Sequence, residues 1–229
     1  MALAMPNGLP RRAERRDQNG GRATYTDRRP MDETALEPTG AALRAGGLRD
    51  QLRDLVLARG YERREQAFLL SSGGRSHDYV DLRRAVSRGE DLDLAGRAVA
   101  EALDSAGIGY DLIGGLTMGA DPVAHAVAML TGRSWFSVRK AAKEHGTGRR
   151  TEGAMLVDGH RAVVFEDTVS TGRSLLEALE VVHASPAQVV AVCTLLDRGE
   201  ALSAHLVKAS PNLSYIRVLT YADLGIEPL

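Results

Sequence analysis

Two adjacent acidic residues, Glu166 and Asp167, are followed directly by a turn rich in hydroxyl groups and glycine. An apolar run precedes the acids and a helical pattern follows the turn, which predicts a strand, a turn and a helix. A turn at a helix N-terminus presents free backbone N–H groups and a favourable dipole to a phosphate. The residues expected to hold such a phosphate are Thr168, Val169, Ser170, Thr171, Gly172, Arg173 and Ser174.

The two carboxylates cannot grip a phosphate themselves, because like charges repel. They suit vicinal hydroxyls, or a metal ion that carries a phosphate. A site with a phosphate at one end and a diol at the other fits a ribose phosphate. An ordinary strand–turn–helix capped by Thr or Ser would account for the same residues. The segment has neither Gly-Lys-Ser/Thr nor Gly-x-Gly-x-x-Gly, which excludes a P-loop and a dinucleotide fingerprint.

The segment from 163 to 174 resembles the motif of type I phosphoribosyltransferases that binds phosphoribosyl pyrophosphate (PRPP). In that family the acids hold the ribose hydroxyls and the turn holds the 5′-phosphate, so the resemblance implies these roles for Glu166, Asp167 and residues 168–174. It also implies an α/β fold, in which helices flank a central, mainly parallel sheet and a small hood subdomain is added. The motif leaves the acceptor base open.

Four cationic or proton-donating side chains lie within seven residues: Arg139, Lys140, Lys143 and His145. Such donors would meet the charge that develops on a departing pyrophosphate, and a closing loop would exclude water. A solvated basic loop would have the same composition. The pattern resembles the catalytic loop of orotate phosphoribosyltransferases, which implies PRPP contacts for all four and catalytic roles for Arg139, Lys143 and His145 beside Asp167. In that family the loop reaches the neighbouring subunit's site, which implies a homodimer.

A third glycine-containing segment, residues 113–122, resembles the family's pyrophosphate-binding loop. Its glycines, Gly114, Gly115 and Gly119, permit close approach of the backbone to an anion. Many orotate enzymes carry Tyr-Lys where Thr117 and Met118 stand here, so a lysine contact to pyrophosphate is absent or is supplied from elsewhere. A plain left-handed turn with a cap by Asp121 is the alternative.

Two further segments resemble the parts of the family that hold the base. Residues 68–73 resemble the segment over the orotate, where many members have lysine at the position of Ser71, and Tyr79 stands in the place of an aromatic pair. Leu196-Asp197-Arg198 resembles the family's Leu-Asp-Arg, whose arginine pairs with the orotate carboxylate. A surface salt bridge between Arg198 and Glu200 is the alternative. Ser170 stands where the family often has an orotate-contacting threonine. The resemblance implies base contacts for Ser71, Tyr79, Ser170 and Arg198.

These residues must be positioned by alternating strands and helices. Strands are expected at 68–70, 79–82, 111–113, 135–138, 161–165, 188–196 and 215–219. Helices are expected at 43–56 with a stop at Gly60, and at 92–106, 122–130 and 174–183. This alternation predicts a parallel sheet covered on both faces, with ligands beyond the carboxyl ends of its strands.

The composition changes near residue 40. Residues 1–40, with seven arginines before residue 30, are predicted to be a disordered tail, and residues 41–229 the phosphoribosyltransferase domain, with a hood built largely from 60–85 and the C-terminal part. A solvated tail, an over-extended start before Met31, a transit peptide and a polyanion-binding arm all remain open for this segment.

The composition excludes several functional classes. The net charge is −1 and aromatic residues make up 4% of the 229 residues, so we expect no nucleic-acid partner. The single cysteine, Cys193, lies in an apolar run and is expected to be a buried, inert thiol. No apolar stretch is long enough to span a bilayer and no signal-peptide core is present, so we expect no membrane partner and a cytoplasmic location.

The expected activity is the Mg²⁺-dependent transfer of phosphoribose from PRPP to N1 of orotate in pyrimidine biosynthesis, giving orotidine 5′-monophosphate and pyrophosphate. Mg²⁺ is expected to arrive bound with PRPP, and no residue is assigned as a metal ligand. Two alternatives stay open: a phosphoribosyltransferase for another base, and a PRPP-sensing regulator that binds nucleic acid.

Overall fold

The computed structural model describes residues 46–69, 75–141, 150–199 and 213–227, with backbone only at 68 and 69. The tail predicted at 1–40 and the domain boundary that follows it lie outside these ranges.

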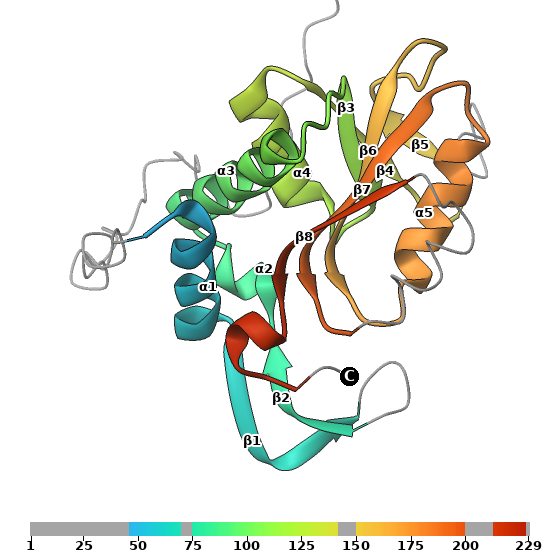
Figure 1. Ribbon diagram of the computed structural model, residues 1–229. Helices are drawn as coiled ribbons and strands as arrows, with labels where there is room; N and C mark the ends of the chain where they lie inside the picture. Colours follow the sequence, from blue (N-terminus) through green and yellow to red (C-terminus); the bar gives the residue numbers. More distant parts are fainter. Residues whose placement is uncertain (1–45, 70–74, 142–149, 200–212, 228–229) are drawn as a thin grey trace, which may run out of the picture. The chain divides into compact units, whose positions relative to one another are not determined.

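The described residues form a six-stranded sheet in the order β5-β4-β3-β6-β7-β8 (Figure 1). Its strands are β3 (Leu112–Leu116), β4 (Ser134–Val138), β5 (Thr151–Gly153), β6 (Arg161–Val169), β7 (Gln188–Asp197) and β8 (Ser214–Thr220). All neighbours pair in parallel except β4 and β5, which are antiparallel. The predicted fold class, an α/β protein with a mainly parallel sheet, is confirmed.

Helices cover both faces of this sheet. They are α1 (Leu48–Arg59), α3 (Gly89–Ser105), α4 (Asp121–Thr131) and α5 (Arg173–His183). Alternate residues of a strand point to opposite faces, so Val163 and Phe165 join the core with α1, α3 and α4. Ala162 and Val164 join a second core beneath α5. Figure 1 shows α5 alone on its side of the sheet.

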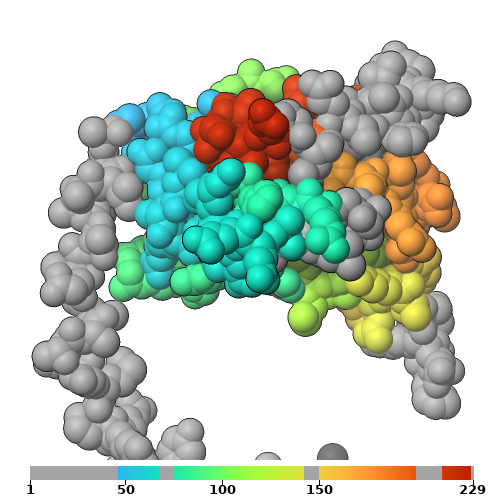
Figure 2. Space-filling view, turned by 90° about the horizontal axis from the view of Figure 1, so that it is seen from below, coloured from blue at the N-terminus to red at the C-terminus, as the bar shows by residue number. Residues whose placement is uncertain are grey.

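A separate antiparallel hairpin joins β1 (Tyr61–Leu69) and β2 (Arg75–Val80). It lies below the main sheet in Figure 1, and Figure 2 shows it from below, beside α1 and the C-terminal residues. The strand predicted at 68–70 covers only the end of β1, because residues 62–66 are polar on both faces. The strand predicted at 79–82 is too long: Leu82 begins the short helix α2 (Leu82–Ala85), since the Asp81 carboxylate accepts a hydrogen bond from the Arg84 N–H at 3.0 Å.

Two core strands run further than the sequence predicts. β3 continues through Gly114 and Gly115, where a Cβ atom would lie 1.8 Å from the carbonyl oxygens of Phe136 and Phe165 respectively. The glycines therefore allow close packing of the neighbouring strands rather than ending the strand. β6 continues to Val169, because its ladder with β7 extends as far as the pair Val169 and Asp197.

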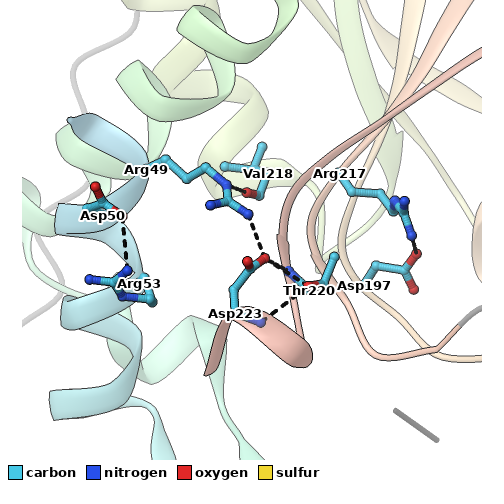
Figure 3. A network of polar contacts seen from close by, with 8 residues as sticks. All are labelled: Arg49, Asp50, Arg53, Asp197, Arg217, Val218, Thr220 and Asp223. Carbon is cyan, nitrogen blue, oxygen red and sulfur yellow. Dashed lines mark hydrogen bonds and ion pairs between the residues drawn. The ribbon is translucent and has the colours of Figure 1, made fainter. Parts of the chain in front are cut away.

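The last strand and the turn after it are tied to α1. The Asp223 carboxylate accepts hydrogen bonds from the backbone N–H of Thr220 at 2.7 Å and from its hydroxyl at 2.8 Å (Figure 3). Arg49 of α1 pairs with Asp223 at 2.7 Å and donates to the Val218 carbonyl at 2.9 Å. These contacts fix the short 3₁₀ helix η2 (Ala222–Leu224) against the domain.

Candidate active site

The turn between β6 and α5 lines a cavity of about 450 Å³, together with Glu166. Gly172 precedes α5 in the left-handed conformation (φ +77°), which L side chains rarely adopt, and no side chain caps the helix. The alternative of a helix capped by Thr or Ser is therefore wrong. The uncapped N–H groups of the first turn and the hydroxyls of Ser170, Thr171 and Ser174 form a cradle for an anion.

The two acids lie side by side at the end of β6. The side chain of Glu166 is buried, and its Oε2 has no hydrogen-bond partner among the described residues. Burial and the neighbouring Asp167 carboxylate raise the pKa of Glu166 well above its usual range. At Gly119 a Cβ would lie 2.8 Å from Asp167 Oδ1 and 3.1 Å from Glu166 Oε1, so glycine alone leaves space beside both acids.

A second cavity of about 350 Å³ adjoins the first, since Glu166 and Ser174 line both. Its other lining residues are Arg83, Leu116, Thr117, Met118, Gly119 and Lys140. The Thr117–Met118 peptide is cis. Asp121 holds this segment, because its carboxylate accepts hydrogen bonds from the hydroxyls of Thr117 and Ser137, both at 2.6 Å. The alternative of a left-handed turn with an Asp121 cap is wrong, since Ala120 precedes α4 in a right-handed conformation.

The described part of the basic loop is fixed where the loop leaves and rejoins the sheet. The Arg139 N–H donates to the Arg150 carbonyl at 2.7 Å. The Arg150 side chain donates to the carbonyl oxygens of Arg139 and Lys140, both at 3.1 Å, and to Glu177 of α5 at 2.5 Å. Arg139 also pairs with Glu152 at 3.5 Å. Arg139 lines neither cavity.

Arg198 stands at the end of β7, next to the buried Asp197. The Asp197 carboxylate accepts hydrogen bonds from the Gly199 N–H at 3.1 Å and the Tyr215 hydroxyl at 3.0 Å, and it lies 3.8 Å from Arg217 (Figure 3).

The Arg198 backbone and side chain have different partners. Its N–H donates to the Val169 carbonyl at 2.8 Å, and its Nε donates to the Tyr221 hydroxyl at 2.5 Å. Its Nη2 is buried without a partner among the described residues. A buried guanidinium nitrogen with unused donors is suited to an anionic group of a ligand.

Comparisons with known proteins identify the family. The family model for the phosphoribosyl transferase domain matches residues 88–211. The orotate phosphoribosyltransferase of Streptomyces avermitilis is 40% identical over 187 residues, which cover 80% of this chain and 97% of that protein. The enzyme of the same name from Mycobacterium leprae is 45% identical over 159 residues, covering 69% of this chain and 86% of the relative.

The chain belongs to the phosphoribosyltransferase family. Solved structures agree. The Mycobacterium tuberculosis orotate phosphoribosyltransferase in complex with PRPP matches with a TM-score of 0.63 at 38% identity, over 79% of this chain and all of that chain. The same enzyme in complex with Fe(III) dicitrate matches with a TM-score of 0.65 at 40% identity and the same coverage. The resemblance inferred from the motifs is confirmed.

The phosphoribosyltransferase brings part of the predicted PRPP set together in the two cavities: Glu166, residues 168–174 and Lys140. Asp167 stays a predicted site residue beside Glu166. Lys143, His145, Ser71 and Glu200 lie outside the described residues. Tyr79 lies in β2 opposite Glu62 and lines neither cavity.

Sequence reasoning missed Arg83, Arg150 and Tyr221 as residues of this region. Asp81, directly before Leu82, is a favourable helix N-cap residue and was the available sequence signal for α2, and hence for Arg83. Arg150 and Tyr221 carry no local signal, because their partners are distant in sequence.

Expectations about the cysteine, metal ligands and membrane-spanning segments also came from the sequence. Cys193 is buried, and burial raises the pKa of its thiol, as expected for an inert side chain. The described ranges contain no cluster of three or more His, Cys, Asp or Glu side chains that could hold a metal ion. Within the same ranges, no helix combines the length and the apolar character needed to cross a membrane.

Proposed function

We propose that this phosphoribosyltransferase is an orotate phosphoribosyltransferase. N1 of orotate forms a bond to C1′ of PRPP, the bond from C1′ to pyrophosphate breaks, and orotidine 5′-monophosphate is released for pyrimidine nucleotide biosynthesis. The observation that carries the proposal is the acid pair beside an uncapped, hydroxyl-rich turn, in a chain 40% identical to an enzyme of that name along 97% of its length.

The geometry supports one role for each part of the site. Residues 168–174, from the end of β6 through the turn to the first residues of α5, hold the 5′-phosphate through their N–H and hydroxyl groups. Glu166 and Asp167 hold the ribose hydroxyls, with Gly119 leaving the space beside them. Lys140, together with Arg139, Lys143 and His145 of the basic loop, stabilises the charge that develops on pyrophosphate.

The base is held from the end of β7. The buried Nη2 of Arg198 donates to the carboxylate of orotate, which a guanidinium recognises well. Ser170, one residue beyond the Val169 carbonyl that binds the Arg198 N–H, donates to the base. We assign Ser71 and Tyr79 to the opposite side of the base, within a hood formed by residues 60–85 and the C-terminal part.

Mg²⁺ fits this site as a cation carried by PRPP. Glu166 has an oxygen without a hydrogen-bond partner in the described part of the chain, and it stands beside Asp167. The pair therefore offers two carboxylates on one side of the site. Mg²⁺ usually takes one or two carboxylates and completes its shell with phosphate oxygens and water. When bound, the ion neutralises negative charge on the pyrophosphate. The protein's own part is to position the ribose against the base and to supply donors for the leaving group.

We further propose a cytoplasmic homodimer in which the basic loop of one subunit, beyond Lys140, serves its partner's site. What supports this is the resemblance of residues 139–146 to the catalytic loop of orotate phosphoribosyltransferases. Mixing a Lys143→Ala subunit with a subunit inactive at Asp167 should restore activity. If the mixture of the two variants stays inactive, loop sharing between subunits is contradicted.

Orotate consumption, followed by its ultraviolet absorbance with PRPP and Mg²⁺, tests the activity directly. Parallel reactions offer uracil, hypoxanthine and xanthine. We expect rapid loss of orotate alone, dependent on both PRPP and the metal. Conversion of another base with orotate untouched would contradict the assigned acceptor and leave PRPP chemistry in place.

A further inference from the structure

Helix α2 holds two adjacent arginines in different surroundings. Leu82 and Ala85 are buried in the core and fix one side of the helix. Gly60 packs against it so tightly that a Cβ there would lie 2.9 Å from the Asp81 carbonyl oxygen. The Asp81 carboxylate caps the first turn. Arg83 and Arg84 are consequently the exposed residues of a firmly anchored helix.

The two arginines have different neighbours. Arg83 lines the 350 Å³ cavity with Lys140 and the 116–119 segment. No hydrogen bond or ion pair joins the Arg83 side chain to another described residue. Arg84 does not line the cavity. It lies near Glu62 in β1, whose pKa is lowered by the hydrogen bond from Arg64 and, to a smaller extent, by the charge of Arg84.

The cavity lined by Arg83 has an excess of positive charge. Among the described residues that line it, Arg83 and Lys140 are the two cations and Glu166 is the one acidic residue. The cavity also shares Glu166 and Ser174 with the ribose-phosphate cavity, so an anion bound here would adjoin the ribose.

We propose that Arg83 is a pyrophosphate-binding residue, which supplies the cation that Met118 does not provide on the same cavity. This rests on the proposed function, because the adjoining ribose phosphate makes the anion the pyrophosphate of PRPP. A planar guanidinium matches the oxygens of a phosphate bidentately. An anchored helix places it without a large loss of conformational freedom on binding.

The neighbouring arginine provides a matched control. Arg83→Ala and Arg84→Ala remove the same charge from adjacent positions of one helix. Binding of inorganic pyrophosphate to the full chain, measured by titration calorimetry with Mg²⁺, should weaken about tenfold in Arg83→Ala and less than twofold in Arg84→Ala. KM for PRPP should rise in parallel, with KM for orotate unchanged. Equal pyrophosphate affinity in the two variants would overturn the proposal.

The calorimetric result is independent of the acceptor base. If the wild-type protein leaves orotate untouched but the two variants differ in pyrophosphate binding, the proposed function fails and the role of Arg83 stands. A second variant tests the charge itself: Met118→Lys, added to Arg83→Ala, should restore most of the affinity, because residue 118 lines the same cavity. If affinity stays at the level of Arg83→Ala, the loss comes from a displaced α2, and the proposal is wrong.

Discussion

Arg198 donates a hydrogen bond from Nε to the hydroxyl oxygen of Tyr221 at 2.5 Å, which links the end of β7 to the turn after β8. Tyr221 is itself fixed, because its side chain is buried and its N–H donates to the Asp197 carbonyl at 3.0 Å. Thr220 and Asp223, on either side of Tyr221 in the chain, are hydrogen-bonded to each other (Figure 3). The guanidinium is thus held with Nη2 still available for a ligand.

Tyr221→Phe should therefore weaken orotate binding. A hydrogen bond to a charged group contributes about 1.5–3 kcal/mol, so KM for orotate should rise about tenfold or more, with KM for PRPP nearly constant. Tyr110→Phe is the control, since Tyr110 is also buried but its ring lies beside Arg133 rather than Arg198. Equal rises in both KM values would show that the hydroxyl supports the whole site rather than Arg198.

Glu166 should make the stability of the protein depend on pH. Its pKa is raised in the folded state, so the folded protein binds more protons than the unfolded chain once the pH exceeds the ordinary carboxyl value. Stability should then fall as the pH rises from 5 to 8, by about 1.4 kcal/mol for each unit titrated within the shifted range. Glu166→Gln removes this dependence. Melting temperatures of both proteins across this range test it, and parallel curves would contradict it.

Gly119→Ala should disable PRPP use without unfolding the protein. The added methyl group would lie 2.8 Å from Asp167 Oδ1 and push the acids out of place. A displacement of about 1 Å near reacting groups costs on the order of 100-fold, so kcat/KM for PRPP should fall by about that factor. Gly89→Ala is the control, since its Cβ meets nothing within 4 Å. Unchanged kcat/KM in Gly119→Ala would show that the acid pair accommodates the methyl group.

Arg150 should act on the reaction through the backbone of the basic loop. Its side chain holds the carbonyl oxygens of Arg139 and Lys140 and ties them to Glu177. Arg150→Ala should lower kcat about tenfold or more by releasing Lys140, with KM for orotate nearly constant. Arg97→Ala breaks an exposed ion pair with Asp93 on α3 and should change neither value. A kcat equal to wild type in Arg150→Ala would remove Arg150 from the catalytic machinery.

The sequence predicted the parts of the site that are local in the chain. Residues 166–174 carry their own strand, turn and helix signals, so the phosphate cradle was recognisable without long-range information. Arg83 was missed because α2 is only four residues long, too short for a helical period to be visible. The pairing of Arg198 with Tyr221 depends on parallel strands meeting at one sheet edge, which periodicity does not specify.

The strand boundaries show the same limit. Residues 61–67 of β1 were missed because a hairpin exposed on both faces has no apolar alternation. The sequence predicts that β3 ends at its glycines, since glycine weakens isolated strands. In the folded sheet they are instead the residues that let β4 and β6 approach, which only the neighbouring carbonyl oxygens reveal.

The same glycines divide β3 into a tolerant half and an intolerant half. Leu112 and Ile113 pack in apolar cores that accept other aliphatic side chains of similar volume. Gly114 and Gly115 accept none, because even a methyl group would overlap a carbonyl oxygen of the adjoining strand. Saturation mutagenesis of this strand should therefore yield a sharp step in survival between positions 113 and 114. Positions 114 and 115 must then remain glycine because of the backbones of β4 and β6, whichever base the enzyme accepts.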